Sequence, residues 1–328
     1  MEFSATHHPF RLLGSQFTSL PYPDTDCTGK VVIVTGANVG LGLEAARHFV
    51  RLNAAKVILG CRNVDKGEAA KADIVASTGR EGVIEVWQVD LSSFESVKEF
   101  CQRADTLDRL DIVLENAALA TQEYQVCEGY ERQMTVDVIS TFLMALLLLP
   151  ALRRSATKFN VLPHLVFVVS TAHFFAVFRQ RHDPSIFEAL RGPADMFDRY
   201  SVVKLLDVLI TRELAWETAA NGKPKVVINM VDPGLCKSQL FRDATFPVSW
   251  IMSSLMFISG RTAEVGSRNL VAAALADESS HGGYIQDCQL REPSSFVRSQ
   301  EGHEAQKKVY EELLDLLEEI EPGIGGNL

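Results

Sequence analysis

Tyr200 and Lys204 lie four residues apart in the stretch Tyr200-Ser-Val-Val-Lys204, so a helix would place a phenol and an amine on one face. A free phenol titrates near ~10 and is a weak base at neutral pH, but a nearby ammonium favours the phenolate and lowers the pKa. The pair could therefore donate or accept a proton. The same spacing also occurs by chance on ordinary helices, so the rest of the chain must decide.

A glycine-rich turn lies between a predicted strand and a predicted helix. The β-branched run Val-Val-Ile-Val after Lys30 is typical of a strand buried on both faces of a parallel sheet. Thr35-Gly36-Ala-Asn38-Val-Gly40-Leu41-Gly42 follows, and a helical pattern then continues to Leu52. Such glycines allow a pyrophosphate to approach the backbone and the N-terminus of the helix. The alternative is an ordinary strand–helix turn with glycines kept for packing.

Arg62 follows a second predicted strand, residues 56–60. In a dinucleotide-binding fold, an acid at this place binds the free ribose 2′-hydroxyl, whereas an arginine accommodates a 2′-phosphate. No acid is present here, and Lys66 lies just beyond. We therefore expect NADP rather than NAD as the cofactor, with solvated surface charges as the alternative.

Strands and helices alternate along most of the chain, which predicts an α/β fold with a doubly wound parallel sheet (a Rossmann fold) in a single domain. Asp90, Asn116 and Ser170 should lie at the carboxyl edge of the sheet, where such folds bind ligands. We expect an N-terminal arm at 1–28, a Rossmann domain at 29–290 and a C-terminal helical extension at 291–328. Further predicted elements are strands at 83–89, 111–114, 165–169 and 225–231, and helices at 92–108 and 128–152.

Composition narrows the function classes. The 328-residue chain has a formal net charge of −10, which argues against nucleic acid or an anionic membrane surface as the partner. The six cysteines show no metal-binding or disulfide spacing, so we expect no metal site and a reducing, cytoplasmic location. The longest apolar run, residues 142–152, is about half of the ~20 residues that a membrane-spanning helix needs. We interpret it as a buried helix and expect no spanning segment.

Several motifs occur together in one order along the chain. They are Thr35-Gly36-xxx-Gly40-x-Gly42, Asp90-Leu91, Asn116-Ala117, Ser170, Tyr200-xxx-Lys204 and Pro233-Gly234. Over about residues 29 to 290 this set resembles the short-chain dehydrogenase/reductase family, and in particular its retinol-dehydrogenase-like branch. More narrowly, it resembles fungal secondary-metabolite reductases, which share a Pro-Tyr-Pro arm and a C-terminal helix such as residues 304–320.

The resemblance implies a hydride-transfer site. Tyr200 would be the proton donor or acceptor, Lys204 would lower the pKa of Tyr200 and bind the nicotinamide ribose, and Ser170 would hydrogen-bond the substrate oxygen. Asp137 occupies the fourth catalytic position. The cofactor supplies the hydride, and the protein supplies orientation and proton transfer. The residues expected to bind the cofactor are Gly36, Asn38, Gly40, Leu41, Gly42, Arg62, Asp90, Leu91, Asn116, Tyr200, Lys204, Leu235 and Ser238.

The sequence departs from the family pattern at two acids. Glu115 replaces the first asparagine of the family's Asn-Asn-Ala-Gly motif, and Asp137 replaces the helix asparagine that helps hold a water chain to the catalytic lysine. Asp137 either fills the position structurally, or its carboxylate reaches Lys204 and shifts the pH profile. We favour the structural role, because the relay in related enzymes uses the main chain.

The segments near 171–199 and 236–260 are expected to bind substrate. Aromatic residues are frequent in the first, which is consistent with an apolar pocket for a lipophilic substrate but equally with core packing.

The leading functional hypothesis is an NADP(H)-dependent oxidoreductase that interconverts a ketone and a secondary alcohol of a lipophilic metabolite in secondary-metabolite biosynthesis. The alternatives are a non-redox enzyme of the same fold and a cofactor-binding protein with a decayed site. Helices 92–108 and 128–152 form dimer interfaces in related enzymes, so their pattern is compatible with a homodimer, and equally with burial in the chain's own core.

Overall fold

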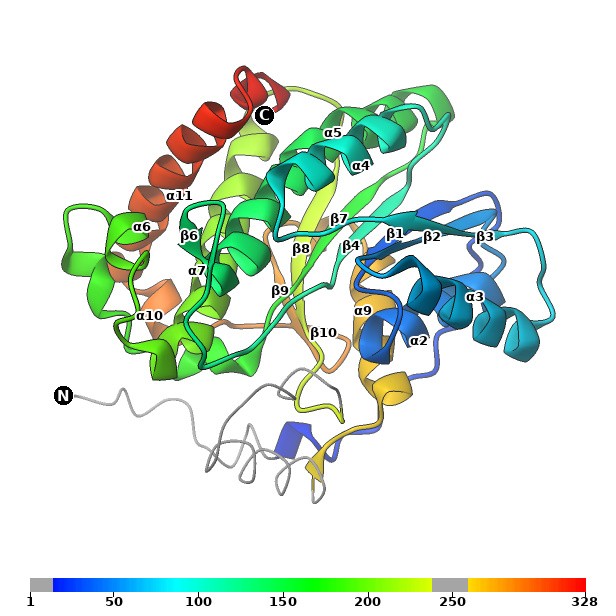
Figure 1. Cartoon of the computed structure of the whole chain (residues 1–328). Coiled ribbons are helices and arrows are strands. Elements are labelled where there is room, and N and C mark those ends of the chain that lie inside the picture. The colour runs from blue at the N-terminus through cyan, green and yellow to red at the C-terminus, as the bar shows by residue number, and fades with distance from the viewer. Residues whose placement is uncertain (1–13, 238–258) are drawn as a thin grey trace.

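The computed structural model describes residues 14–237 and 259–328. Its centre is an eight-stranded sheet with the order β10-β9-β8-β7-β4-β1-β2-β3 (Figure 1). All neighbouring strands are parallel except β9 and β10. The strands are β1 (Val31–Thr35), β2 (Lys56–Cys61), β3 (Ile84–Gln88), β4 (Ile112–Glu115), β7 (His164–Val168), β8 (Val227–Asp232), β9 (Tyr284–Gln286) and β10 (Gln289–Arg291).

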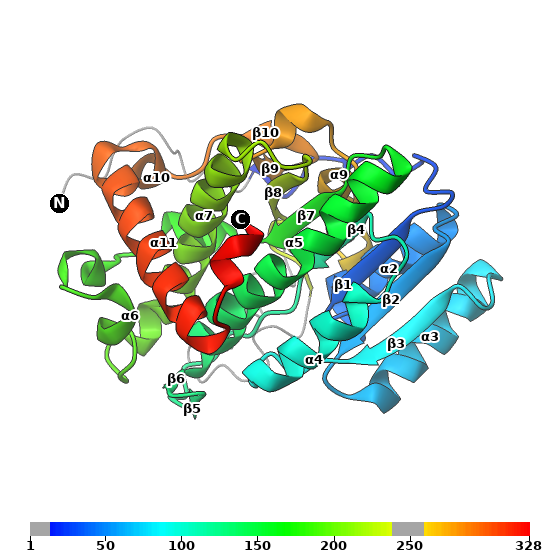
Figure 2. The same cartoon turned by 90° about the horizontal axis from the view of Figure 1, so that it is seen from above.

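Helices cover both faces of this sheet, as Figure 2 shows from above. α4, α5, α7 and α11 contribute to one hydrophobic cluster, and α2, α3 and α9 contribute to the other. The predicted doubly wound α/β fold is therefore confirmed. The helices are α2 (Gly40–Arg51), α3 (Val64–Thr78), α4 (Phe94–Asp105), α5 (Ser140–Phe159), α6 (Ile186–Ala189), α7 (Met196–Ala220), α9 (Ala263–Ala274), α10 (Ser295–Arg298) and α11 (Gln300–Ile320).

The continuous apolar runs of the central strands reflect this two-sided burial. In β1, Ile33 belongs to the cluster on one face, whereas Val32 and Val34 belong to the cluster on the other. Successive side chains of a strand point to opposite faces. A strand covered by helices on both sides therefore requires apolar residues at every position rather than at alternate ones.

The predicted helix at 128–152 is wrong at both ends. Residues 126–131 form a hairpin of β5 (Val126–Cys127) and β6 (Tyr130–Glu131), and the two loop residues Glu128 and Gly129 have φ of 52° and 81°. Positive φ at both loop positions is the requirement of a tight two-residue hairpin turn. A π-helical turn, η1 (Met134–Ile139), follows and leads into α5, which continues through Pro150 to Phe159.

The helical stretch Met134–Phe159 is also longer than the apolar run suggested. It has 26 residues and a mean hydropathy of 2.0, so its length and composition alone would allow a membrane span. Within the part of the chain that the structure describes, no other helix meets these criteria. Most of the stretch, 89% of its most apolar window, is buried inside the protein, which is the environment of a core helix.

Both ends of the described chain pack against the domain. In the N-terminal arm, the Ser15 hydroxyl donates to the Asp287 carboxylate at 2.7 and 2.8 Å, and the Tyr22 ring lies edge-on to His48. At the other end, α11 lies along α7 (Figure 1). It begins four residues before the predicted start, where the Ser299 side chain accepts a hydrogen bond from the Gly302 N–H as an N-cap.

Candidate active site

The glycine-rich turn joins β1 to α2 at the carboxyl edge of the sheet. Gly36 and Gly40 have φ of 64° and 63°, a conformation that glycine adopts without strain. Val39, the N-cap residue of α2, makes no side-chain capping hydrogen bond, so the first N–H groups of the helix face no capping oxygen. A Cβ at Gly40 would meet nothing within 4 Å. The open approach and uncapped N–H groups fit the pyrophosphate of a dinucleotide.

Asn116, just after β4, holds this turn in place. Its Nδ2 donates to the carbonyl oxygens of Thr35 at 2.8 Å and Gly36 at 3.4 Å. A Cβ at Gly42 would lie 2.5 Å from that Nδ2 and 2.7 Å from the Gly36 oxygen. The turn therefore has no space for a larger residue at Gly42. Asn38 and Leu41, which belong to the same turn, are half-buried.

Glu115 is buried beneath the turn. The Thr35 hydroxyl donates to its Oε2 at 3.2 Å, and its Oε1 has no hydrogen-bond partner among the described residues. Burial raises the pKa of Glu115 to about 8, and the hydrogen bond from Thr35 offsets only part of this shift. The carboxyl group is therefore mostly protonated at neutral pH, so the acid adds little charge near the expected cofactor site.

Arg62 and Asp90 follow the ends of the adjacent parallel strands β2 and β3. Arg62 is exposed at this edge, and Lys66 is exposed close by in the first turn of α3. Asp90 Oδ1 accepts hydrogen bonds from the Ser92 N–H and hydroxyl, while Leu91 is buried. The structure thus gathers these sequence-predicted residues at the carboxyl edge of the sheet, where the adenosine of a dinucleotide binds in such folds.

Ser170, Tyr200 and Lys204 come together beyond β7. Ser170 caps the short helix η2 (Thr171–Phe174), and Tyr200 and Lys204 share one face of α7. Ser170 and Tyr200 are joined by a side-chain hydrogen bond. Burial raises the pKa of Tyr200 to about 12, although Lys204 and the Ser170 hydrogen bond both act to lower it. The expected net lowering is therefore wrong, because desolvation of the phenolate exceeds the effect of the ammonium.

Lys204 is almost fully buried, at 4% exposure, between two carboxylates. Its Nζ donates to Asp207 Oδ2 at 2.9 Å and to the Val168 carbonyl at 3.3 Å. Asp137 Oδ2 lies 3.9 Å away, on the π-helical turn η1. The net effect of the two carboxylates and Tyr200 is a raised pKa, so Lys204 is an ammonium at neutral pH although burial opposes its charge.

Asp137 makes one hydrogen bond to the main chain. Its Oδ1 accepts from the Leu119 N–H at 3.0 Å, whereas Oδ2 has no hydrogen-bond partner among the described residues. Burial raises the pKa of Asp137 to about 8, against the lowering effect of Lys204. Its carboxyl group thus approaches Lys204 directly, but it is mostly uncharged at neutral pH. The structural role favoured for Asp137 therefore stays a prediction.

Sequence reasoning missed Asp207. The residue lies three positions after Lys204, and this spacing places two side chains together on a helix surface. Burial raises its pKa to about 6, and the hydrogen bond with Lys204 acts in the opposite direction. Asp207 is therefore ionised at neutral pH and is the main counter-charge of Lys204.

The loop after β8 approaches the same edge. Asp232 Oδ2 accepts hydrogen bonds from the hydroxyls of Thr171 and Tyr284, and its Oδ1 accepts from the Gly234 N–H at 2.8 Å. These bonds tie the loop to the residue next to Ser170. Leu235 is half-buried and its carbonyl accepts from the Arg261 N–H. Ser238 lies outside the described residues, as does most of the predicted substrate segment 236–260.

The other predicted substrate segment, 171–199, consists of short helices joined by loops and is anchored by a buried ion pair. The fully buried Arg199 Nη1 lies 3.1 Å from Glu131 Oε2, and the Arg199 guanidinium also donates to main-chain carbonyls of the segment. Large apolar side chains within the segment are nevertheless exposed: Phe175 at 65%, Val177 at 55% and Phe197 at 81%. His173 Nδ1 contacts the Ser170 carbonyl at 2.7 Å, which is a structural contact.

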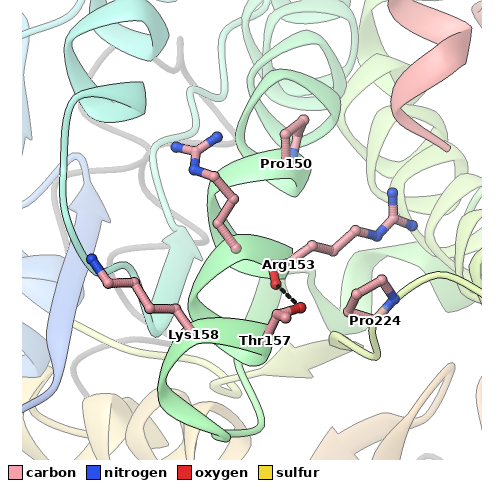
Figure 3. A pocket seen from close by; sticks show the side chains of 6 residues that line it. Pro150, Arg153, Thr157, Lys158 and Pro224 are labelled. Carbon is pink, nitrogen blue, oxygen red and sulfur yellow. Dashed lines mark hydrogen bonds between the residues drawn. The ribbon is translucent and has the colours of Figure 1, made fainter.

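A cavity of about 430 Å³ lies away from these residues (Figure 3). It is lined by Pro150, Arg153, Arg154, Thr157, Lys158 and Pro224. All but Pro224 belong to the C-terminal half of α5, which ends at the opposite edge of the sheet from Tyr200. Arg154 and Lys158 form ion pairs with Asp105 and Asp108, so the cavity is not the catalytic centre. Residues 14–237 and 259–328 contain no group of three or more potential metal ligands.

Comparison with known proteins adds sequence evidence to this geometry. Residues 30–180 match the family model described as short chain dehydrogenase. A short chain dehydrogenase/reductase of Cryptosporiopsis sp. (strain 8999) is 42% identical over 324 residues, which cover 96% of this chain and 99% of the relative. The chain belongs to the short-chain dehydrogenase/reductase family. It is therefore an enzyme of an oxidoreductase family that binds a nicotinamide cofactor.

Another relative and two solved structures are also similar to this chain. A short-chain dehydrogenase of Penicillium roqueforti (strain FM164) is 40% identical over 96% of this chain and 84% of the relative. A Mycobacterium Paratuberculosis protein of solved structure is 25% identical, with a TM-score of 0.63 over 89% of this chain and 95% of its own. A putative NAD(P) dependent gluconate 5-dehydrogenase from Beutenbergia cavernae, with bound NADP, shares the fold. It is 20% identical, with a TM-score of 0.59 over 80% of this chain and 96% of its own.

Proposed function

We propose that this short-chain dehydrogenase/reductase is an NADP(H)-dependent enzyme that interconverts a ketone and a secondary alcohol on a lipophilic metabolite. The observation that carries the proposal is the assembly of Ser170, Tyr200 and Lys204 at the carboxyl edge of the sheet, the same edge at which the uncapped N-terminus of α2 lies. A proton-transfer group and a dinucleotide site on one edge suit a hydride-transfer reaction.

The residues divide the chemistry between them. When bound, NADPH would supply a hydride to the carbonyl carbon. Ser170 hydrogen-bonds the substrate oxygen, and Tyr200 donates its phenolic proton to that oxygen as the carbonyl π electrons move onto it. In alcohol oxidation the Tyr200 phenolate accepts the hydroxyl proton instead. The Lys204 ammonium stabilises the phenolate and would hold the nicotinamide ribose of the bound cofactor.

The cofactor preference rests on charge at the end of β2. Arg62 and Lys66 are exposed there, and Arg62 rather than an acid directly follows the strand. A ribose 2′-phosphate would gain a charge-assisted hydrogen bond from Arg62. A free 2′-hydroxyl would lack the carboxylate that usually binds it in NAD enzymes.

Exposed apolar side chains in the segment between Ser170 and Tyr200 support a lipophilic substrate. Phe175, Val177 and Phe197 are each more than half exposed. Phe175 and Val177 follow η2, which Ser170 caps, and Phe197 lies in the first turn of α7, three residues before Tyr200. An apolar molecule at this surface would remove their area from water. The resemblance to fungal reductases of secondary-metabolite pathways supports a role in such a pathway.

The decisive experiment measures NADPH consumption over a panel of bulky apolar ketones, with the Tyr200→Phe variant as a control. We expect turnover by the wild type and a loss of roughly 10²–10⁴-fold or more in the variant, since only the proton donor is removed. Cofactor affinity should change little because the ring remains. Turnover retained by Tyr200→Phe would refute the assigned role. Substrate conversion without net NADPH consumption would favour the non-redox alternative.

A further inference from the structure

Asp207 contacts the Lys204 ammonium and follows Lys204 on α7, whereas Tyr200 precedes it. Its carboxylate is 3% exposed and contacts the Lys204 ammonium at 2.9 Å, while Oδ1 has no hydrogen-bond partner among the described residues. Asp207 is one helical turn further along α7, and Tyr200 is one turn before Lys204. The ammonium therefore lies between a carboxylate on one side and the phenol on the other.

The other ionisable groups near this cluster come from three elements. Asp137 approaches Lys204 at 3.9 Å from η1. Asp232, at the end of β8, acts electrostatically on Tyr200, and Glu131 of β6 acts on Asp137. Glu131 and Asp232 are engaged elsewhere, by Arg199 and by the loop around Thr171 respectively. Among Asp137, Asp207, Asp232 and Glu131, Asp207 is thus the acid that accepts a hydrogen bond from the Lys204 ammonium.

We propose that Asp207 is a positioning residue that fixes the Lys204 ammonium and balances its charge, so that Tyr200 keeps its proton up to a higher pH and the site favours carbonyl reduction. The inference rests on the proposed oxidoreductase function. A lone ammonium would pull the phenol strongly toward phenolate, whereas a close ion pair exerts a weaker field at the same distance.

The protonation state of Tyr200 determines which direction of the reaction can proceed, because reduction needs a phenol that donates a proton and oxidation needs a phenolate that accepts one. In reduction, the carbonyl carbon gains a hydride with two electrons, and the oxygen takes the phenolic proton of Tyr200. In oxidation, the phenolate must already be present to accept the alcohol proton. Tyr200 regains or releases its proton to solvent between turnovers. A site that keeps the phenol protonated therefore carries out reduction at neutral pH and needs a higher pH for oxidation.

The test compares pH profiles of kcat/KM in both directions for the wild type and Asp207→Asn. We expect the inflection assigned to Tyr200 to fall by about one pH unit in the variant, which is roughly a tenfold gain in oxidation at a fixed pH below the inflection. Reduction should begin to decline at a correspondingly lower pH. Asp207→Glu keeps the charge and should retain the wild-type inflection.

The matched control is Glu213→Gln. Glu213 is another buried acid of α7, hydrogen-bonded to Gln306 of α11 at 2.6 Å, and its neutralisation should leave the inflection unchanged. An unchanged inflection in Asp207→Asn, or an equal shift in Glu213→Gln, would overturn the proposal. If Asp207→Asn does not fold, Asp207→Ser serves in its place, with the same expected shift and the same refuting result.

A second measurement separates this inference from the proposed function. The phenolate absorbance of Tyr200 can be titrated without turnover, in a protein with NADP⁺ bound, as the difference between each form and its Tyr200→Phe counterpart. We expect the Asp207→Asn form to ionise at lower pH than the wild type even if no ketone in the panel is a substrate. Identical titrations would refute the role of Asp207, whereas a shift without any turnover would refute only the proposed reaction.

Discussion

Replacement of Arg199 by leucine should strongly destabilise the protein. The Arg199 side chain is completely buried with that of Glu131, and the two form an ion pair at 3.1 Å. Arg199 also donates to the carbonyl oxygens of Leu190 at 2.7 Å, and of Gly192 and Ala194 at 3.0 Å. The substitution leaves a buried carboxylate without its cation and leaves three carbonyls without donors.

The expected cost in free energy of unfolding is about 3–5 kcal/mol, the usual result of removing one partner of a buried ion pair. Glu131 still accepts hydrogen bonds from the Gln133 and Met134 N–H groups, so we expect a value near the lower end. Arg199 directly precedes Tyr200 and fixes the loop before α7. KM should therefore rise more than kcat falls. Chemical denaturation and steady-state kinetics measure the two effects.

The matched control is Arg191→Leu. Arg191 pairs with Glu188 at 2.9 Å, but both side chains are largely exposed, and such pairs contribute about 0–1 kcal/mol. A Glu131→Leu, Arg199→Leu double variant should recover part of the loss, because an apolar pair avoids the cost of burying an unpaired charge. The reasoning fails if Arg199→Leu costs no more than Arg191→Leu, or if the double variant is as unstable as the sum of the single changes.

Three further outcomes test the cofactor site and the altered catalytic position. NADPH should bind more tightly than NADH, and Arg62→Ala should remove most of a difference of about 1.5–3 kcal/mol; equal affinities in the wild type, measured by fluorescence titration, would contradict this. Gly42→Ala should weaken cofactor binding at least about tenfold, because its Cβ would lie 2.5 Å from Asn116 Nδ2. The control Gly326→Ala should leave cofactor binding unchanged, because a Cβ there meets nothing within 4 Å. Asp137→Asn should match wild-type turnover near pH 7, because the raised pKa of about 8 keeps Asp137 mostly neutral there. Above pH 8 the wild-type carboxylate is charged, so the variant should oxidise alcohol faster than the wild type. Loss of activity at pH 7 would mean that the carboxyl group takes part in the chemistry.

Local sequence signals predicted most of the fold. The β-branched run before Gly36 and the glycines after it predict a strand, a turn and a helix from adjacent residues, and β1 and α2 lie where expected. The start of the helix after β4 could not be placed in the same way. Glu128-Gly129 closes a hairpin there. The number of apolar residues in a stretch does not reveal a turn of only two residues.

The candidate site was predicted where motif spacing carries the chemistry and missed where burial decides it. Tyr200 and Lys204 follow from a helical repeat, and Asp207 could have been found from its i+3 spacing to Lys204. The pair of Arg199 and Glu131 joins residues 68 positions apart, for which no local pattern exists. The pKa of Tyr200 depends on desolvation, which only the folded structure reveals.

The acids near the site act differently because their surroundings differ. Glu115 and Asp137 have raised pKa values of about 8, since burial outweighs the few groups that stabilise their charge. Asp207, hydrogen-bonded to the Lys204 ammonium, has a lower pKa of about 6. At neutral pH the site therefore holds one ion pair and two mostly neutral carboxyl groups. Two acids that replace family asparagines thus act nearly as uncharged residues, and substitution at these positions leaves the Tyr200 and Lys204 arrangement compatible with carbonyl reduction. Above pH 8 both acids gain charge, which opposes ionisation of Tyr200 and favours the positively charged, oxidised nicotinamide.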